Sequence, residues 1–245
     1  FPPPSVCAGG GRFVSVGGNT DRRWWTSDDG ITWAAHNQSG TFFGSCAYGN
    51  GWFVASDAGG PTRSVDGQTW AAPAGGFVPN HLRTMTFAGD RFVAAGDNGR
   101  VAVTLDGTQW DIDQVLGIGG LRQITAGGGS IVAAGENGWV ATSSDGGQNW
   151  SSQQVGSTTH GGVLFNTDTF FVGGGGSVYS STDGLVWQLV NGNNATPMAA
   201  FGRYLFGMSS NDMVMMRSED GGFSWTTMYT STGGFPLGHA AMESP

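Results

Sequence analysis

The chain alternates between short runs of hydrophobic and polar residues and corners that are rich in glycine. Polar and apolar side chains alternate over residues 84–87, and the short apolar runs 92–95 and 101–103 lie on either side of the corner Gly96-Asp-Asn-Gly99. A period of two is typical of β-strands with one buried face. An Asn-Gly pair between two such runs predicts a tight hairpin. The pattern therefore predicts an all-β protein built from short antiparallel strands.

One stretch of polar corner residues recurs six times, and each copy ends in a tryptophan. Successive tryptophans are 37, 40, 40, 37 and 38 residues apart. A fixed period near 40 residues is the mark of stacked supersecondary units, and with short strands it favours the blades of a β-propeller. The copies are Ser27-Asp-Asp29-Gly30-Ile-Thr-Trp33, Ser64-Val-Asp66-Gly67-Gln-Thr-Trp70, Thr104-Leu-Asp106-Gly107-Thr-Gln-Trp110, Ser143-Ser-Asp145-Gly146-Gly147-Gln-Asn-Trp150, Ser181-Thr-Asp183-Gly184-Leu-Val-Trp187 and Ser218-Glu-Asp220-Gly221-Gly222-Phe-Ser-Trp225.

We therefore predict one β-propeller domain over residues 1–245, made of four-stranded antiparallel blades. Six blades are favoured because six full copies are present. Seven are possible because the tail resembles one more first strand. The predicted blades span about 4–39, 40–79, 80–119, 120–158, 159–195 and 196–231, and the tail is 232–245.

The repeated stretch predicts a self-contained turn with an apolar anchor. Glycine supplies a positive φ, and the aspartate and the preceding hydroxyl can bond to nearby backbone amides. The tryptophan opens the next strand and is expected to bury its ring. These residues are therefore assigned a structural role, and no part in ligand binding: Asp29, Trp33, Asp66, Trp70, Asp106, Trp110, Asp145, Trp150, Asp183, Trp187, Asp220 and Trp225.

The stretch resembles the Asp-box (BNR) repeat, Ser-x-Asp-x-Gly-x-Thr-Trp, of sialidase-like propellers, over about residues 5–231. Three copies fit the family spacing, if the first is aligned on Thr26 and Asp28, and the copies at 64, 104 and 181 are one residue shorter. The resemblance implies that each box joins the third and fourth strands of a blade, away from any active site. The corners at residues 96–99 and 135–138 also resemble those of photosystem II assembly propellers.

Composition narrows the function classes. The chain has 45 glycines, a net charge of −8 and ten basic residues that are all arginine. An acidic chain without lysine argues against nucleic acid as a general partner, because phosphate binding needs a basic surface. No apolar run is long enough for a transmembrane helix, so no membrane insertion is expected. The chain begins with Phe1, which suggests a processed form or a fragment, and we expect an extracellular or cell-surface protein.

The chain contains two cysteines, Cys7 and Cys46, at equivalent positions of the first two blades. Side chains related by a rotation about the ring point the same way, so a disulfide is disfavoured and free buried thiols are expected. A disulfide is the alternative, because two cysteines are enough for one.

Arginine and histidine side chains gather at one predicted face, the one that carries the connections between blades. Four arginines there, with two histidines nearby, form a candidate anion or carboxylate site. The alternative is that they pair with Asp97, Glu136 and the backbone at hairpin corners. Two tryptophans at polar repeat positions are candidate exposed rings for a ligand, whereas Trp24 is expected to pack between blades. The candidate binding residues are Arg23, Arg83, Arg100, Arg122, His81, His160, Trp52 and Trp139.

Catalytic residues are not evident. Only Glu136 among three glutamates lies on the plausible face, with Tyr179 in a neighbouring blade, so no carboxylate pair for glycoside hydrolysis can be assigned. Asp111 and Asp113 are expected to be solvated. No metal-ligand spacing is present, and no cofactor is expected. The favoured function is a non-catalytic scaffold that binds a glycan or a protein surface. The alternatives are a glycoside hydrolase or lyase of the sialidase-like superfamily, and an assembly factor.

Overall fold

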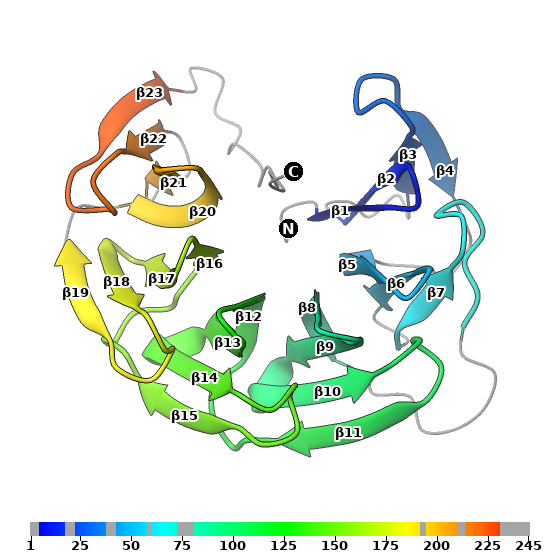
Figure 1. Ribbon diagram of the computed structural model, residues 1–245, viewed down its shortest axis with the longest axis horizontal. Coiled ribbons are helices and arrows are strands. Elements are labelled where there is room, and N and C mark those ends of the chain that lie inside the picture. The colour runs from blue at the N-terminus through cyan, green and yellow to red at the C-terminus, as the bar shows by residue number, and fades with distance from the viewer. Residues whose placement is uncertain are drawn as a thin grey trace. The chain divides into compact units, whose positions relative to one another are not determined.

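The computed structural model describes residues 5–17, 23–37, 43–57, 60–72, 81–191, 195–209 and 214–230. Six antiparallel sheets are present in these ranges, as expected for the blades of a β-propeller (Figure 1). The sheets belong to two compact units of three. Unit 1 comprises Phe1–Gly120 with Gly146–Gln148, and unit 2 comprises Leu121–Asp145 with Asn149–Pro245.

Unit 1 holds the first three blades. Blades 1 and 3 are four-stranded, as predicted, and blade 2 has three strands and one further bridge from Arg63 to Ala71. Residues 73–79, the end of the predicted second blade, lie outside the described residues. The strands are β1 (Ser5–Gly9), β2 (Arg12–Val16), β3 (Arg23–Ser27) and β4 (Ala34–Asn37); β5 (Phe43–Gly49), β6 (Trp52–Asp57) and β7 (Thr62–Ser64); β8 (Leu82–Ala88), β9 (Arg91–Gly96), β10 (Arg100–Thr104) and β11 (Trp110–Val115).

Unit 2 holds three four-stranded blades in which consecutive strands pair. The predicted tail, residues 232–245, lies outside the described residues. The strands are β12 (Leu121–Gly127), β13 (Ser130–Gly135), β14 (Trp139–Ser143) and β15 (Ser151–Gln154); β16 (Gly162–Asn166), β17 (Thr169–Gly174), β18 (Ser177–Ser181) and β19 (Gln188–Asn191); β20 (Ala195–Phe201), β21 (Tyr204–Ser209), β22 (Val214–Ser218) and β23 (Thr226–Thr230).

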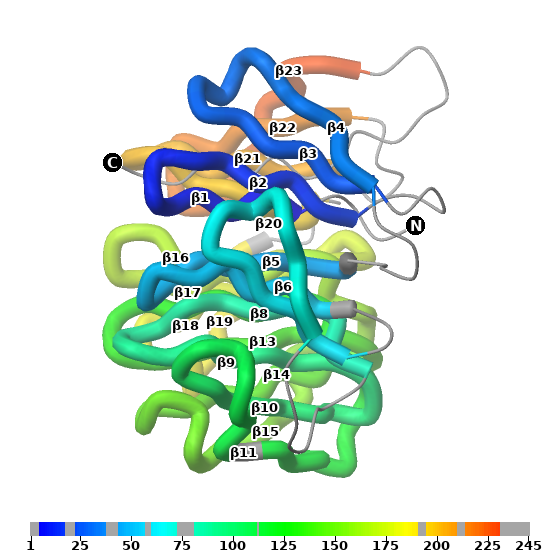
Figure 2. Tube along the Cα trace, turned by 90° about the vertical axis from the view of Figure 1, so that its right-hand side faces the viewer, coloured from blue at the N-terminus to red at the C-terminus, as the bar shows by residue number. Residues whose placement is uncertain are grey.

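Within each unit the first strands of successive blades lie side by side, as Figures 1 and 2 show for β1, β5 and β8. A ring and a glycine form both joints of unit 1. A Cβ atom at Gly9 would lie 1.8 Å from the ring of Tyr48, and one at Gly49 would lie 2.1 Å from the ring of Phe87. Only glycine lets the ring of one blade lie flat on the strand before it. Gly127 and Phe165 repeat the arrangement in unit 2.

The repeated corner joins the third and fourth strands of its blade, and its geometry is closed by its own side chains. In blade 2 the Oδ1 atom of Asp66 accepts the backbone N–H groups of Gln68 at 2.8 Å and Thr69 at 2.9 Å, while Ser64 Oγ accepts that of Gly67 at 2.8 Å. The corner thus satisfies backbone donors that no strand partner reaches.

The longer corners keep the same plan with one more residue. Asp220 Oδ1 accepts the N–H of Ser224 at 2.9 Å, and Ser218 Oγ accepts that of Gly222 at 2.8 Å. Both glycines of this corner, Gly221 and Gly222, have positive φ, of 74° and 92°, values that side chains avoid. The short and long motifs therefore build equivalent turns.

In the first corner, the alignment of the Asp-box repeat on Thr26 and Asp28 is wrong. Asp29 is the acceptor, since its Oδ1 atom receives the backbone N–H of Ile31 at 2.8 Å. Asp28 instead pairs with Arg12, and Thr26 bonds to His36. The family spacing was matched one residue too early because two aspartates stand side by side in this corner.

The corner tryptophans pack against the preceding blade of their unit. Trp70 joins the core cluster of blade 1 with Val14 and Trp24, and Trp110 joins Ala47 and Val54 of blade 2. In unit 2, Trp187 and Trp225 are partly buried in the same way.

The prediction of a buried ring is wrong for Trp33, which is 38% exposed. Its corner belongs to the first blade of unit 1, and among the described residues of that unit no earlier sheet is present for the ring to cover. Trp150, in the first blade of unit 2, is partly buried.

The expectation of free thiols is also wrong, because Cys7 and Cys46 form a disulfide with a Cα–Cα distance of 5.8 Å. Equivalent side chains point in similar directions, but the distance between the strands that carry them also decides whether a bridge can form. First strands of adjacent blades lie against each other, so equivalent side chains on β1 and β5 meet at the joint. Both cysteines are buried, in the cluster that contains Val14, Val16 and Phe53.

The corners should make stability depend on acidity. The backbone N–H groups of Thr32 and Ile31, then the hydroxyl of Ser27, lower the pKa of Asp29 from 3.8 to about 2. The hydroxyl and N–H of Ser224 lower the pKa of Asp220 to about 2 as well. A depressed folded pKa adds stability that is complete above the unfolded value and is lost as the pH falls through the folded value.

We therefore expect the melting temperature to fall between pH 4 and 2, below an earlier decline that begins near pH 6.5, where the buried imidazole of His160, whose pKa burial lowers, opposes protonation. Thermal melts followed by circular dichroism across this range check it. In the double variant Asp29→Asn/Asp220→Asn the fall should be smaller. An equal fall in both proteins would contradict the assignment.

Candidate functional site

The candidate site in unit 1 is built on the hairpin between β9 and β10 of blade 3. Asn98 and Gly99 have φ of 56° and 69°, as both central residues of a type I′ turn require. The backbone N–H of Asp97 donates to the carbonyl of His81 at 3.0 Å, so the hairpin is tied to the residue that precedes β8. The turn thereby fixes Asp97 at the exposed end of the blade.

Arg83, Asp97 and His81 come together at this end. Arg83 Nε donates to Asp97 Oδ1, and His81 Nδ1 lies 3.6 Å from Asp97 Oδ2. The side chains of Arg83 and His81 are 51% and 64% exposed. The predicted alternative, pairing at the hairpin corner, is therefore confirmed for Arg83. One carboxylate holds both basic groups in place while they face solvent.

Blade 4 repeats the arrangement in unit 2. The hairpin between β13 and β14 has Asn137 at φ of 54°, and an Arg122 N–H donates to Glu136 Oε1 at 2.9 Å. The Arg122 side chain is 48% exposed. Trp139, half-buried, begins the next strand. We call the two ends, with Arg83 and Asp97 in one and Arg122 and Glu136 in the other, the arginine corners.

The other two candidate arginines, Arg100 and Arg23, lie outside the arginine corners. Arg100 opens β10 as predicted and binds both oxygens of Asp113, at 2.6 and 2.5 Å. The expectation that Asp113 is solvated is wrong, since β10 and β11 pair Ala102 with Asp113 and bring it under the guanidinium, where its side chain is only 18% exposed. Asp111 is exposed as expected, and so is Arg23, at the start of β3.

Two candidates do not join the arginine corners. Trp52 lies at the opposite end of its blade, next to the hairpin between β5 and β6. The guanidinium of Arg63 lies 3.9 Å from the centre of its ring, so that face of the ring is already covered.

His160 is fully buried, and burial lowers the pKa of its imidazole. Its Nε2 atom lies 2.8 Å from the carbonyl oxygen of Val155. The prediction that His160 contributes to a surface site is therefore wrong, because the connection from β15 turns its side chain inwards. Trp24, by contrast, packs between blades as predicted, with 2% exposure.

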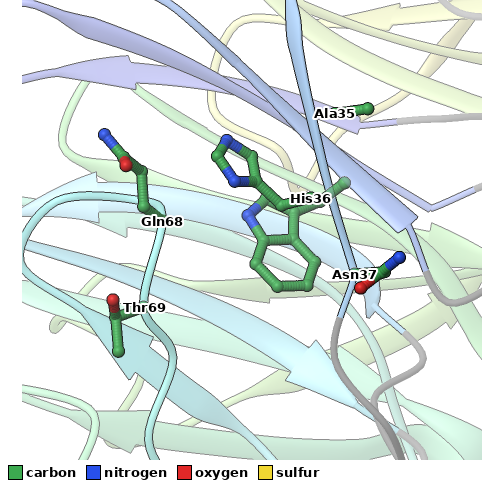
Figure 3. A pocket seen from close by; sticks show the side chains of 6 residues that line it. Ala35, His36, Asn37, Gln68 and Thr69 are labelled. Carbon is green, nitrogen blue, oxygen red and sulfur yellow. The ribbon is translucent and has the colours of Figure 1, made fainter.

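A hollow of about 450 Å³ on unit 1 was not predicted (Figure 3). Its lining residues come from strands β3 and β4 of blade 1 and from the corner of blade 2. No single stretch of sequence marks it, since the two walls are more than 30 residues apart. The residues are Trp24, Ala35, His36, Asn37, Gln68 and Thr69.

Two of the glutamates are engaged in ion pairs. Glu136 binds Arg122, and Glu219 binds Arg203 and Arg217. Within the described ranges no group of three or more His, Cys, Asp or Glu side chains is arranged to hold a metal ion. In the same part of the chain, no helix combines the length and apolar character needed to cross a bilayer.

The chain is similar to known β-propellers. Residues 157–244 match the DUF6242 beta propeller domain. No curated protein matches the chain.

Solved structures with the same fold include YCF48 bound to D1 peptide, at 19% identity and a TM-score of 0.70 over 92% of this chain and 82% of that one. YCF48 from Cyanidioschyzon merolae follows at 15% identity and a TM-score of 0.68, over 92% and 84%. The extracellular domain of the putative one component system BT4673 from B. thetaiotaomicron has 10% identity and a TM-score of 0.70, over 94% of this chain and 37% of that one. At these identities the likeness establishes the β-propeller fold.

Proposed function

We propose that this propeller is a non-catalytic scaffold that binds acidic segments of a partner protein at its arginine corners. The single observation that carries the proposal is the similarity, over 92% of the chain, to a propeller solved as YCF48 bound to D1 peptide. We further propose that residues 1–245 form one domain and belong with the sialidase-like propellers, because in all six corners the Ser or Thr hydroxyl and the Asp carboxylate each accept a backbone N–H.

The chemistry of the arginine corners supports a peptide carboxylate as the bound group. Each guanidinium offers five N–H donors, and the pairs of Arg83 and Arg122 with their own carboxylates each use one of them. The side chains are about half exposed, so the remaining donors are open to a second acceptor. Asp97 and Glu136 fix the direction of each fork and so reduce the entropy that binding costs.

The disulfide supports an extracellular or cell-surface location. Structural disulfides form and persist in oxidising compartments and are rare in the cytosol. Cys7 and Cys46 are both buried, in the core of unit 1, which is the setting of a structural bridge.

A random dodecapeptide phage library, selected on the immobilised chain, tests the proposal. We expect enrichment of peptides rich in Asp and Glu, whose synthetic forms lose affinity as salt is raised. The variant Arg83→Ala/Arg122→Ala should bind them at least about tenfold more weakly, because a charge-assisted pair of this kind is worth about 1.5–3 kcal/mol.

Arg91→Ala provides the matched control. Arg91 pairs with Asp90 at 3.0 Å at the opposite end of blade 3, so its loss should leave peptide affinity unchanged. Exposed pairs contribute about 0–1 kcal/mol to stability, so all variants should fold. Selection of no acidic peptides, or equal affinity of the double variant, would refute the proposal.

A second candidate function is assembly of a larger complex. The similarity to YCF48 structures and the resemblance of residues 96–99 and 135–138 to assembly propellers favour it. In this function the propeller binds a segment of one subunit only until that subunit joins its complex. The affinity of the propeller for the segment should then fall when the next subunit of the complex is added.

A further inference from the structure

The outer strand of a blade bridges to the corner of the next blade in two places. In unit 2, Gln153 Nε2 on β15 donates to the carbonyl of Leu185 at 2.6 Å, and Thr142 Oγ1 donates to that of Gly184 at 2.7 Å. In unit 1, Gln114 Nε2 on β11 donates to the carbonyl of Gln148 at 3.1 Å. A glutamine at this position therefore closes the space between an outer strand and a corner.

His36 occupies the same position in blade 1. It pairs with Trp24 across β3 and β4, as Gln153 pairs with Val140 and Gln114 with Val101. The corner residue facing it is Gln68, which follows Gly67 as Leu185 follows Gly184. By analogy His36 would reach the carbonyl of Gln68, and the described residues show no such bond.

His36 turns towards its own blade instead. Its Nε2 atom lies 2.8 Å from Thr26 Oγ1, and its ring is stacked on that of Trp24, with centroids 5.5 Å apart and planes 20° apart. The carbonyl of Gly67, which a threonine hydroxyl would otherwise bind, accepts the indole N–H of Trp24 at 2.8 Å. The space that a glutamine fills elsewhere is left as the hollow of Figure 3.

Both walls of the hollow are held rigidly. Asp66 fixes the backbone of Gln68 and Thr69, and the indole N–H of Trp70 donates to Gly67 O at 3.1 Å. On the other side, Trp24 supports His36 from beneath and Thr26 fixes its edge. A preformed site loses little entropy when it binds a ligand.

The lining defines the class of ligand. None of the side chains carries a permanent charge, so a charged ligand finds no counter-ion there. Figure 3 shows Gln68 and Thr69 across the space from Asn37, with His36 between them. Amide and hydroxyl groups both donate and accept hydrogen bonds, which matches vicinal hydroxyls, and a flat supported ring matches the C–H face of a sugar. The volume, about 450 Å³, lies within the usual range of about 300–1,000 Å³ for small-molecule sites.

We propose that this hollow binds one neutral hexopyranose unit, with the sugar face on His36 and its hydroxyls on Asn37, Gln68 and Thr69. The lining of the hollow shares no residue with the arginine corners. The proposal of sugar binding therefore does not depend on the proposal of peptide binding.

Titration with glucose, galactose, mannose and N-acetylglucosamine, followed by NMR of the side-chain amide signals of Asn37 and Gln68, tests the proposal. At least one sugar should shift both signals with a dissociation constant on the order of 1–10 mM, as expected for a ligand with few atoms. Sialic acid, which carries a carboxylate, should cause no shift of comparable size.

His36→Gln is the decisive variant, because a glutamine there can bridge to the corner as Gln153 does and close the hollow. Sugar affinity should fall at least tenfold while the melting temperature holds. Gln68→Ala, at an exposed position, should weaken binding without unfolding, and Gln188→Ala on the exposed outer strand β19 should change nothing. The absence of any sugar-induced shift, a preference for sialic acid, or full binding by His36→Gln would overturn the proposal.

Discussion

Replacement of Trp110 by alanine is expected to lower the free energy of unfolding by about 3–5 kcal/mol, as for a large buried ring. Trp110 is 9% exposed and packs on Ala47, Val54 and Ala102, so its removal leaves a cavity between blades 2 and 3. Urea unfolding monitored by circular dichroism measures the change. A loss of less than about 1 kcal/mol would show that the joint between these blades does not depend on the ring.

Phenylalanine at the same position separates packing from hydrogen bonding. The indole N–H of Trp110 has no partner among the described residues, whereas that of Trp70 donates to Gly67 O at 3.1 Å. Trp110→Phe should therefore recover most of the stability, and Trp70→Phe should cost about 1 kcal/mol more than Trp110→Phe. Equal costs would contradict the difference between the two corners.

Asp106→Ala tests the polar half of the same corner. Asp106 Oδ1 accepts the backbone N–H of Thr108 at 2.8 Å, so its loss should cost about 1–3 kcal/mol by leaving that donor unpaired. Peptide and sugar binding by the folded fraction should stay unchanged. Loss of binding without loss of stability would show that the corner is a functional element.

The double variant Cys7→Ala/Cys46→Ala is expected to lose about 4 kcal/mol, because the bridge constrains a long loop of the unfolded chain. The cysteines are separated by 39 residues. Guanidinium unfolding of the variant and of the oxidised wild type measures the difference. Reduced wild type should unfold with the midpoint of the variant, and a reductant should leave the variant unchanged.

The rate of reduction gives an independent check. Both sulfur-bearing residues are at most 5% exposed, so a reductant should reach the bridge only when β1 and β5 separate. Labelling of thiols should therefore be slow in buffer and should accelerate with subdenaturing guanidinium. Fast labelling in buffer would mean that this joint opens without unfolding.

The repeated elements could be predicted because their causes are local. Asp106 and Gly107 dictate a turn by their own hydrogen bonds and φ angles, and the burial of Trp110 follows from its place after that turn. The pairing of Arg83 with Asp97 and of Arg122 with Glu136 was available as an alternative, since each arginine lies a fixed distance in sequence from its hairpin.

The remaining features depend on neighbours in space that no period reveals. Cys7 and Cys46 meet because β1 and β5 are adjacent, and the repeat in the sequence does not give the distance between these strands. The hollow exists because His36 stands at the position that a glutamine occupies in two other blades. This difference can be recognised only once the strand registers are known. Trp33 is exposed because its blade is the first of its unit, although its motif is the same as in the other blades.

The rings of Tyr48, Phe87 and Phe165, and those of the corner tryptophans Trp70 and Trp110, cover the blade that was made before their own. During synthesis, each newly emerging repeat thus buries apolar side chains of the blade that has already left the ribosome. Within a unit, a nascent chain has to shield only its most recent blade. The contacts that complete a joint come from segments about one repeat apart, so their loop-closure entropy stays small and does not grow as translation proceeds.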